Sequence, residues 1–290
     1  MNSIKLALKV LGRRKFFTFI SLFGISLTLV VLIVAAAILD NLFAPRKPES
    51  RFDRVLCVYR FGMYGPHSSM NTDPGYGFLD RWMRTLPDIE RASIFTNPGT
   101  VAMFHAGQRV EMTLRRTDGE YWRILDFRFL EGRPFTPAEE AGSAHVAVIN
   151  DRLRAKLFGN APALGQTISF EDQSFRVIGV VPAVPSVRLA AWADVWVPIS
   201  TMKSSAYRHE LMGDFHGIVL ARDRADFKRL QSEFATRMKH MPIENPREFS
   251  EVRSTLDTPF EAFAHGMTNT DRAAAILRGI FVLAAILFMT

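Results

Sequence analysis

Cysteine is nearly absent from this chain of 290 residues, in which Cys57 is the single example. An intrachain disulfide is therefore excluded, and the fold has to be stabilised by its own apolar core even in an oxidising compartment. A domain of about 200 residues can bury enough apolar surface for that purpose. Because Cys57 lies within the apolar stretch 55–59, we expect it to be a buried small hydrophobic side chain.

Acidic residues are missing from the first fifteen positions, whose five positive charges are Lys5, Lys9, Arg13, Arg14 and Lys15. The formal charge of the whole chain is +7, so the rest of the chain holds only +2 and is nearly neutral. Zinc-finger spacings and aromatic RNA-binding motifs are missing as well, so nucleic-acid binding is not expected. The local basic excess instead indicates membrane topology.

Motifs of catalytic and metal sites are also missing. The chain has neither H-E-x-x-H nor G-x-x-x-x-G-K-[ST], and without the latter it is not expected to hydrolyse ATP. Ser200 and Lys203 match S-x-x-K, but without K-T-G or S-D-N this pattern does not predict catalysis, and Ser200 is better explained as a helix cap. Asp214 and His216 alternate onto one strand face, and two ligands cannot close a zinc site. We therefore predict a non-enzymatic protein without catalytic residues, cofactor or metal.

Charge is then absent from Phe16 to Leu39, a run of 24 residues. As a helix this run is about 36 Å long, enough to cross a hydrocarbon core of about 30 Å. Arg13, Arg14 and Lys15 precede it and Asp40 follows it, which predicts a cytoplasmic N-terminus and a translocated remainder. The alternative is a cleavable signal peptide, but the apolar region of a signal peptide has only about 7–15 residues.

Both ends of the chain carry membrane signals. Residues 1–15 are predicted to form a basic amphipathic helix at the cytoplasmic interface, or else a disordered basic tail. The last 12 residues, after Arg278, are uncharged but too few to cross a bilayer. We expect 272–290 to be the start of a second transmembrane helix that the chain truncates, the alternative being an apolar helix buried in the soluble domain.

Residues 40–271 have the mixed pattern of an α+β domain, with helices inserted among hairpins. Two hairpins are predicted, one turning at 106–108 and the other at 171–173. A helix is expected from Asp73-Pro74 to Leu86, and another through Leu125 behind a cap at Thr117 or Asp118. The remaining predicted strands are 54–61, 145–149, 194–198, 215–221 and 249–253, and the remaining helices are 151–158 and 226–240.

The segment 61–77 is rich in glycine and contains tyrosine, methionine and histidine side chains. We interpret it as a mobile loop that contacts a substrate or a periplasmic partner, because binding residues are frequent on such loops. A tolerated surface loop without function is the alternative. The candidate contact residues are Met63, Tyr64, His67, Met70 and Tyr76.

An ordered series of short motifs runs through the centre of the chain. It consists of GRPFT at 132–136, HVAVIN at 145–150, LFG at 157–159, LGQTI at 164–168, FRVIGVV at 175–181 and DVWVP at 194–198. In this order and spacing the series resembles the extracytoplasmic core domain of MacB/FtsX-like ABC transporter permeases. Gly132 and Gly159 suit positions of positive φ, and Gly179 allows close approach or a bend within a strand.

The resemblance implies a non-catalytic permease subunit in a bacterial inner membrane, with residues 40–271 in the periplasm as a core domain of two subdomains. Its implied partners are a cytoplasmic ABC ATPase, a second permease copy or paralogue, the lipid bilayer, and a periplasmic or outer-membrane protein. ATP hydrolysis by the partner would drive export or extrusion. An FtsX-like signalling protein that activates a cell-wall hydrolase without transport is the alternative, and a single-pass anchored binding protein is a third. The third and fourth membrane helices of the family, and the loop that contacts the ATPase, are missing from this sequence.

Overall fold

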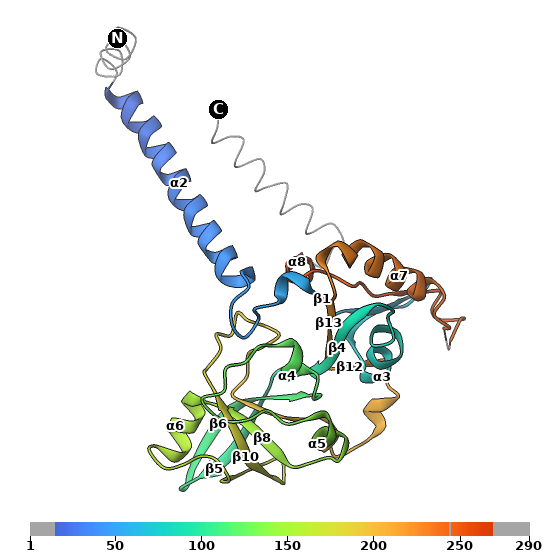
Figure 1. Cartoon of the computed structure of the whole chain (residues 1–290). Coiled ribbons are helices and arrows are strands. Elements are labelled where there is room, and N and C mark those ends of the chain that lie inside the picture. Colours follow the sequence, from blue (N-terminus) through green and yellow to red (C-terminus); the bar gives the residue numbers. More distant parts are fainter. Residues whose placement is uncertain (1–14, 244, 269–290) are drawn as a thin grey trace. The chain divides into compact units, whose positions relative to one another are not determined.

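The computed structural model of the protein describes residues 15–243 and 245–268 (Figure 1). The chain divides into two compact units. One comprises the chain up to Ala44 together with the chain from Ala264 onward, and the other is Pro45–Phe263. The second of these units corresponds to the region between the two predicted membrane segments.

A long helix, α2 (Lys15–Phe43), contains the whole charge-free run of the sequence. Most of the large apolar side chains described along it are exposed, as Phe16 is at 70%, while Leu32 is half-buried. Across residues 15–243 and 245–268, no helix meets the length and hydropathy criteria of a membrane span. The predicted topology residues Arg13 and Arg14 lie outside the described residues, as does 272–290, and only the backbone of Lys15 is described.

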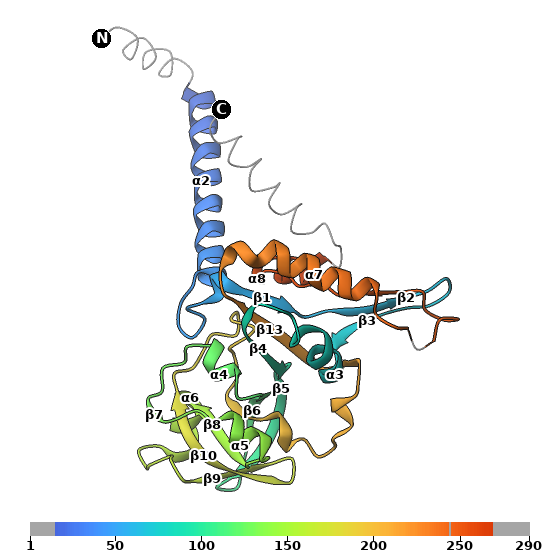
Figure 2. The ribbon, with the colours of Figure 1, turned by 45° about the vertical axis from the view of Figure 1, so that its right-hand side comes forward.

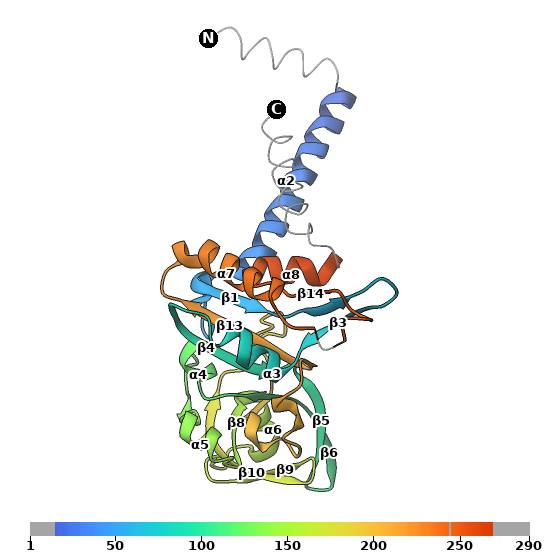
Figure 3. The same ribbon diagram turned by 90° about the vertical axis from the view of Figure 1, so that its right-hand side faces the viewer.

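Strands and short helices make up the Pro45–Phe263 unit (Figures 2 and 3). The strands are β1 (Val55–Val58), β2 (Phe61–Tyr64), β3 (Ser69–Pro74), β4 (Ile89–Thr96), β5 (Gly99–His105), β6 (Gln108–Thr117), β7 (Glu131–Gly132), β8 (Val146–Asn150), β9 (Thr167–Phe170), β10 (Gln173–Val181), β11 (Val195–Pro198), β12 (Met212–Gly213), β13 (Phe215–Ala221) and β14 (Glu251–Arg253). The helices are α3 (Tyr76–Phe78), α4 (Tyr121–Ile124), α5 (Pro137–Ala141), α6 (Asp151–Phe158) and α7 (Phe227–Lys239), with a π-helix at Leu79–Met83 and 3-10 turns at Phe52–Arg54, Ile199–Thr201, Ala206–Arg208 and Arg224–Asp226. α8 (Pro259–Thr268) begins in this unit.

Two sheets organise these strands. The larger sheet has the order β1-β13-β4-β6-β11-β8-β10-β7, with β5 paired to β6 and β9 paired to β10, and the smaller has the order β12-β3-β2-β14. The larger sheet is mixed, because β8 runs parallel to β10 and β11 parallel to β6 while the other pairs are antiparallel. The predicted mixed α/β domain is therefore confirmed.

The two predicted hairpins, β5–β6 and β9–β10, are both present. Each turns through two residues of positive φ, Ala106-Gly107 in the first and Glu171-Asp172 in the second. Positive φ at both central positions is the type I′ geometry, whose twist matches that of the flanking strands. The alternation of apolar and polar residues was therefore sufficient to predict both hairpins.

Glycines of the motif series allow β7 and β10 to approach closely. Gly179 pairs with Gly132 across the two strands, next to a register shift in the β10–β8 pairing. A Cβ atom at Gly179 would lie 2.5 Å from the carbonyl oxygen of Arg133, and Gly132 has a φ of +67°. Both glycines are therefore needed by the backbone itself, as the sequence predicted.

The apolar core lies on both faces of the larger sheet. On one face, α7 buries Leu230 and Phe234 against the sheet, and Figure 2 shows it lying along β1. On the other face Trp196 of β11 is fully buried, and its Nε1 donates a hydrogen bond of 3.3 Å to the Tyr121 hydroxyl of α4. Cys57 is also fully buried within this core, as expected.

One predicted helix boundary is wrong. Asp73 and Pro74 do not open a helix, because they are the last residues of β3 and pair with Gly213 and Met212 of β12. The helix begins instead at Tyr76 and continues as the π-helix at Leu79–Met83. Proline is compatible with both the first turn of a helix and the last residue of a strand, so its presence did not decide between the two.

Candidate functional site

The segment 61–77 is a β-hairpin followed by a helix, and our interpretation of it as a loop is wrong. β2 and β3 pair from Phe61↔Thr72 to Tyr64↔Ser69, and only 65–68 form the turn. The glycines and prolines that suggested a loop lie in the turn, at one position within β2, and around the junction of β3 with α3. Residues 69–74 (SMNTDP) are mostly polar, so the sequence of β3 carries no clear strand signal.

The hairpin does not bring the five candidate contact residues to one surface. Met63 is only 9% exposed and belongs to the apolar core, and Tyr76 packs edge-on against Tyr207 at a ring distance of 5.2 Å. The other three lie at the outer end of the hairpin. There Met70 is 42% exposed, His67 is exposed, and Tyr64 is half-buried.

The ring of Tyr64 is held in place by its neighbours. The guanidinium carbon of Arg253 lies 4.4 Å from its centroid, which is a cation–π distance. Its hydroxyl donates a hydrogen bond to the side-chain oxygen of Asn71, and its carbonyl accepts one from the amide of Ser250 at 2.8 Å. The hairpin therefore presents an ordered aromatic ring on one face near its turn, while Met70, which pairs with Met63, lies on the opposite face.

A second feature, which the sequence did not reveal, is the attachment of the segment that follows α2. We call Lys47–Ser50 and their contacts the linker clamp. The carbonyl of Pro48 accepts a hydrogen bond of 2.7 Å from the amide of Asp126, and the Asp126 carboxylate lies 3.4 Å from Lys47 Nζ. Ser50 donates a longer hydrogen bond of 3.3 Å to the same carboxylate.

The centre of the linker clamp is a buried ion pair. Arg188 Nη1 donates to Glu49 Oε2 at 2.9 Å, and the two side chains are only 6% and 1% exposed. Burial raises the pKa of Glu49, while the hydrogen bond and charge of Arg188 act in the opposite direction. Such a pair contributes little net stability compared with apolar residues, but breaking it leaves a buried charge and costs several kcal/mol, roughly 3–5.

A second buried arginine fixes the loop that carries Arg188. Arg115 of β6 is fully buried, and it donates to the carbonyls of Leu189 at 2.7 Å and Trp192 at 3.2 Å. Its guanidinium carbon lies 4.9 Å from the ring centroid of Phe95. Burial lowers the pKa of Arg115, and Glu49 is among the groups whose charge opposes that shift. The loop between β10 and β11 is therefore held at two points.

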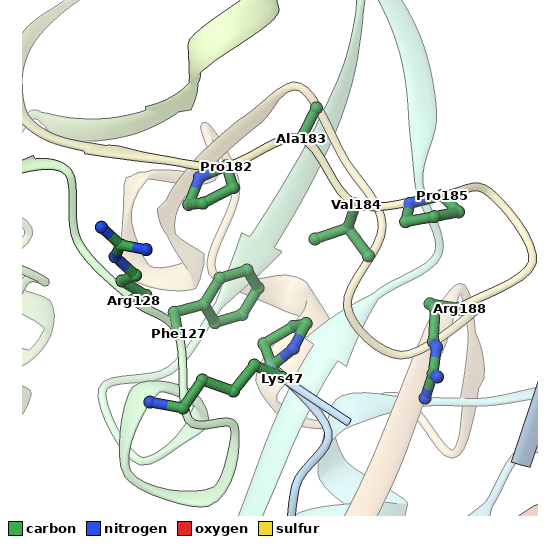
Figure 4. A pocket seen from close by; sticks show the side chains of 9 residues that line it. Lys47, Phe127, Arg128, Pro182, Ala183, Val184, Pro185 and Arg188 are labelled. Atoms are coloured by element: carbon green, nitrogen blue, oxygen red, sulfur yellow. The ribbon is translucent and has the colours of Figure 1, made fainter. Parts of the chain in front are cut away.

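A small cavity of about 100 Å³ lies beside the linker clamp (Figure 4). Figure 4 shows Phe127, Pro182 and Val184 around it, with Lys47 and Arg128 on one side. Pockets that bind drug-sized ligands measure about 300–1,000 Å³. This cavity therefore has room only for a small group, and we assign it no ligand.

Asp118 is the centre of a buried polar network at the end of β6. It was predicted as a helix cap, and it does accept a hydrogen bond of 3.0 Å from the amide of Tyr121, the first residue of α4. It also accepts from Arg84 Nη2 at 2.7 Å, Ser93 Oγ at 2.7 Å and the amide of Ile94 at 2.8 Å. Burial raises the pKa of Asp118, against the lowering effect of Arg84 and the hydrogen bonds. One carboxylate thus joins β4, α4 and the residue that follows the π-helix.

The residue pairs considered for catalysis and metal binding occupy other contacts. Ser200 donates to the carbonyl of Glu140, and Lys203 forms an ion pair of 3.0 Å with Asp172. His216 stacks on Tyr59 at 4.2 Å and faces Asp73 at 3.6 Å. Among residues 15–243 and 245–268, no three His, Cys, Asp or Glu side chains are grouped as metal ligands.

The mixed sheet and the motif glycines define an α/β core domain. The chain belongs to the family described as the MacB-like periplasmic core domain, which matches residues 18–237. Among curated relatives, the pyoverdine export ATP-binding/permease protein PvdT of Pseudomonas aeruginosa is 31% identical over 97 residues. That match covers 33% of this chain and 14% of PvdT. The resemblance drawn from the motif series is confirmed.

Solved structures share the fold. A domain of a protein from Porphyromonas gingivalis has a TM-score of 0.55 at 17% identity, covering 72% of this chain and 90% of that domain. The periplasmic region of MacB from Actinobacillus actinomycetemcomitans has a TM-score of 0.50 at 16% identity, covering 75% and 94%. The chain covers only 10–35% of the length of its first curated relatives.

Proposed function

We propose that this chain acts in the permease subunit of a MacB/FtsX-type ABC transporter in a bacterial inner membrane. In this proposal residues 1–15 are cytoplasmic, 16–39 cross the membrane, 40–271 are periplasmic and 272–290 begin a second membrane helix. The family match over 18–237 supports the assignment. The charge-free run and the exposed apolar side chains of α2 support the membrane segment.

The subunit itself is non-catalytic in this proposal. ATP hydrolysis takes place in a cytoplasmic ABC ATPase, and a second permease copy or paralogue completes a dimer. A periplasmic or outer-membrane protein would receive the exported substrate. Some relatives are named ATP-binding/permease proteins, so the ATPase can be a domain of the same protein or a separate chain.

The linker clamp is the observation that carries the coupling part of the proposal. Lys47 is only four residues beyond the end of α2, a distance of at most about 14 Å for an extended chain. From there Glu49 and Pro48 are fixed to Arg188 and Asp126. A displacement of α2 would therefore be transmitted to the periplasmic domain through a short, anchored segment.

Cysteine labelling in intact cells tests the topology. Phe104, at the end of β5, is 78% exposed, and the native Cys57 is fully buried with a pKa that burial raises. A membrane-impermeant maleimide should label Phe104→Cys and leave Ser3→Cys unlabelled until the cells are broken. The unchanged protein is the matched control, because its single buried cysteine should remain unlabelled. Labelling of Ser3→Cys in intact cells would overturn the proposed orientation.

Purification of the full-length protein from the same membranes tests the energy coupling. We expect an ABC ATPase to be retained with it, or present as a domain of the same polypeptide, and ATP to be hydrolysed by the complex. Retention of a cell-wall hydrolase without any transport activity would favour the FtsX-like signalling alternative. The permease proposal fails if neither an ATPase chain nor an ATPase domain is found.

The outer end of the β2–β3 hairpin is the proposed contact surface for a substrate or periplasmic partner, formed by Tyr64, His67 and Met70. Replacing His67 with alanine and Met70 with serine should reduce the activity of the full-length protein about fivefold or more. Stability should change by less than about 0.5 kcal/mol, because both side chains are exposed. Complementation of a deletion strain and thermal unfolding measure the two effects.

Phe104→Ser provides the matched control, since it removes an exposed apolar side chain from the turn end of a different hairpin. It should leave activity unchanged if the β2–β3 surface is specific. Full activity of the His67→Ala, Met70→Ser variant would remove the hairpin from the proposal.

A further inference from the structure

A larger pocket lies at the turn of the β9–β10 hairpin, away from the linker clamp. Its volume is about 590 Å³, within the range of small-molecule sites. Met202, Ala206 and Tyr207 give it an apolar part, and Arg116 and Lys203 give it two cationic groups. The combination of an apolar lining with a few fixed polar groups is typical of pockets that bind small organic ligands.

Arg116 is held in a fixed position. Its residue is only 8% exposed, its amide donates to Thr96 Oγ1 at 3.0 Å, and its Nη1 donates to Thr201 Oγ1 at 2.8 Å. The second guanidinium nitrogen, Nη2, bonds Glu171 at 2.5 Å. A planar guanidinium fixed in this way is well suited to bind a carboxylate or phosphate oxygen.

Both cations of the pocket are occupied by acidic side chains from one turn. Glu171 pairs with Arg116, and its neighbour Asp172 pairs with Lys203 at 3.0 Å. These two acidic residues are the central residues of the type I′ turn, with φ values of +51° and +58°. Asparagine and glycine are the residues that favour this geometry, and a glutamate there is disfavoured. The turn therefore places carboxylates on the pocket cations, although asparagine and glycine would adopt its backbone conformation more readily.

We propose that this pocket binds a small amphipathic anion, a carboxylate or a phosphate ester with a compact apolar body, and that Glu171 occupies the ligand's place on Arg116 when the pocket is empty. The anion replaces the Glu171 carboxylate on Nη2, and the apolar body lies against Met202 and Tyr207. Glu210 also lines the pocket, which disfavours ligands with more negative charge than a single phosphate monoester carries. No covalent step is involved, and the proposal does not depend on the transport function.

Fluorine NMR on the full chain in detergent micelles tests the site with 4-fluorophenylacetate and 4-fluorophenyl phosphate as probes. We expect at least one of them to bind saturably at one site per chain. The neutral 4-fluorophenylacetamide should bind at least about tenfold more weakly, because it lacks the charge that the guanidinium recognises. The probe that binds more tightly shows whether the pocket prefers a carboxylate or a phosphate.

Three variants distinguish a ligand site from a structural ion pair. Glu171→Gln removes the competing carboxylate and should tighten binding about threefold or more, a gain that a purely structural role would not produce. Lys203→Gln changes a side chain that is 59% exposed and should weaken binding about threefold without affecting folding. Arg116→Gln should abolish binding. Absence of saturable binding in both the unchanged chain and Glu171→Gln, or equal binding of the neutral amide, would overturn the proposal.

Discussion

Replacing Glu49 with alanine should lower the free energy of unfolding by about 3–5 kcal/mol, the largest effect we expect from any single change in the linker clamp. The variant leaves the guanidinium of Arg188 buried without its carboxylate partner. Arginine cannot lose its proton in a protein, so the orphaned charge cannot be neutralised. Urea unfolding of the full chain in detergent measures the loss.

The reciprocal change, Arg188→Met, should cost less and should depend on pH. Here the orphan is Glu49, which can take up a proton. Its pKa is already raised by burial, and it rises further once the hydrogen bond and charge of Arg188, which lower it, are gone. When the pKa of a carboxyl group is higher in the folded state than in the unfolded state, its contribution to stability is complete below the unfolded-state pKa. That contribution is lost as pH rises through the folded-state pKa, so the stability of this variant should fall over that range.

Two comparisons make the Glu49 prediction specific. Combining Glu49→Ala with Arg188→Met should cost less than Glu49→Ala alone, because no charge is left buried. Glu251→Ala breaks an ion pair to Arg253 in which both side chains are about half exposed, and it should cost less than about 1 kcal/mol. If Glu49→Ala costs no more than Glu251→Ala, the linker clamp does not anchor the segment that follows α2.

Local patterns in the sequence were sufficient for much of the fold. The hairpins β5–β6 and β9–β10 follow from alternation on either side of a short polar turn, and helix α6 follows from a short basic stretch that Gly159 closes. The glycines at 132 and 179 were correctly read as backbone requirements. These features depend on residues close together in the chain, where spacing carries the information.

The features that we did not predict from the sequence depend on residues far apart in the chain. Glu49 and Arg188 are separated by 139 positions, and nothing local marks Glu49, which lies in a charged and proline-containing stretch, as a buried side chain. Segment 61–77 was misread because its glycines and prolines suggested a loop and β3 is mostly polar. The pairing with β14 that makes β2 an inner strand comes from residue 251 onward. Arg116 and Glu171 come together in the same way, through the order of strands in the sheet.

Asp118→Ala should destabilise the domain by at least about 3 kcal/mol, because it removes one acceptor from four donors at once. The amides of Ile94 and Tyr121 and the hydroxyl of Ser93 are left without this partner inside the core, and an unsatisfied buried donor costs about 1–3 kcal/mol. The guanidinium of Arg84 also loses its most buried carboxylate. Urea unfolding of the full chain, with hydrogen exchange at the two amides, measures the effect.

The size of the Asp118 effect distinguishes between the role that its sequence position predicts and the role that its contacts imply. If Asp118 only capped α4, its replacement with alanine would lower the free energy of unfolding by about 1 kcal/mol. Asp80→Ala is the matched control, because Asp80 pairs with the same Arg84 at 2.5 Å but is 48% exposed, and its loss should cost less than about 1 kcal/mol. A loss near 1 kcal/mol for Asp118→Ala, equal to that of Asp80→Ala, would contradict the network. A loss several times larger means that one buried carboxylate joins β4, α4 and the π-helix, so a displacement of any of them is felt by the others.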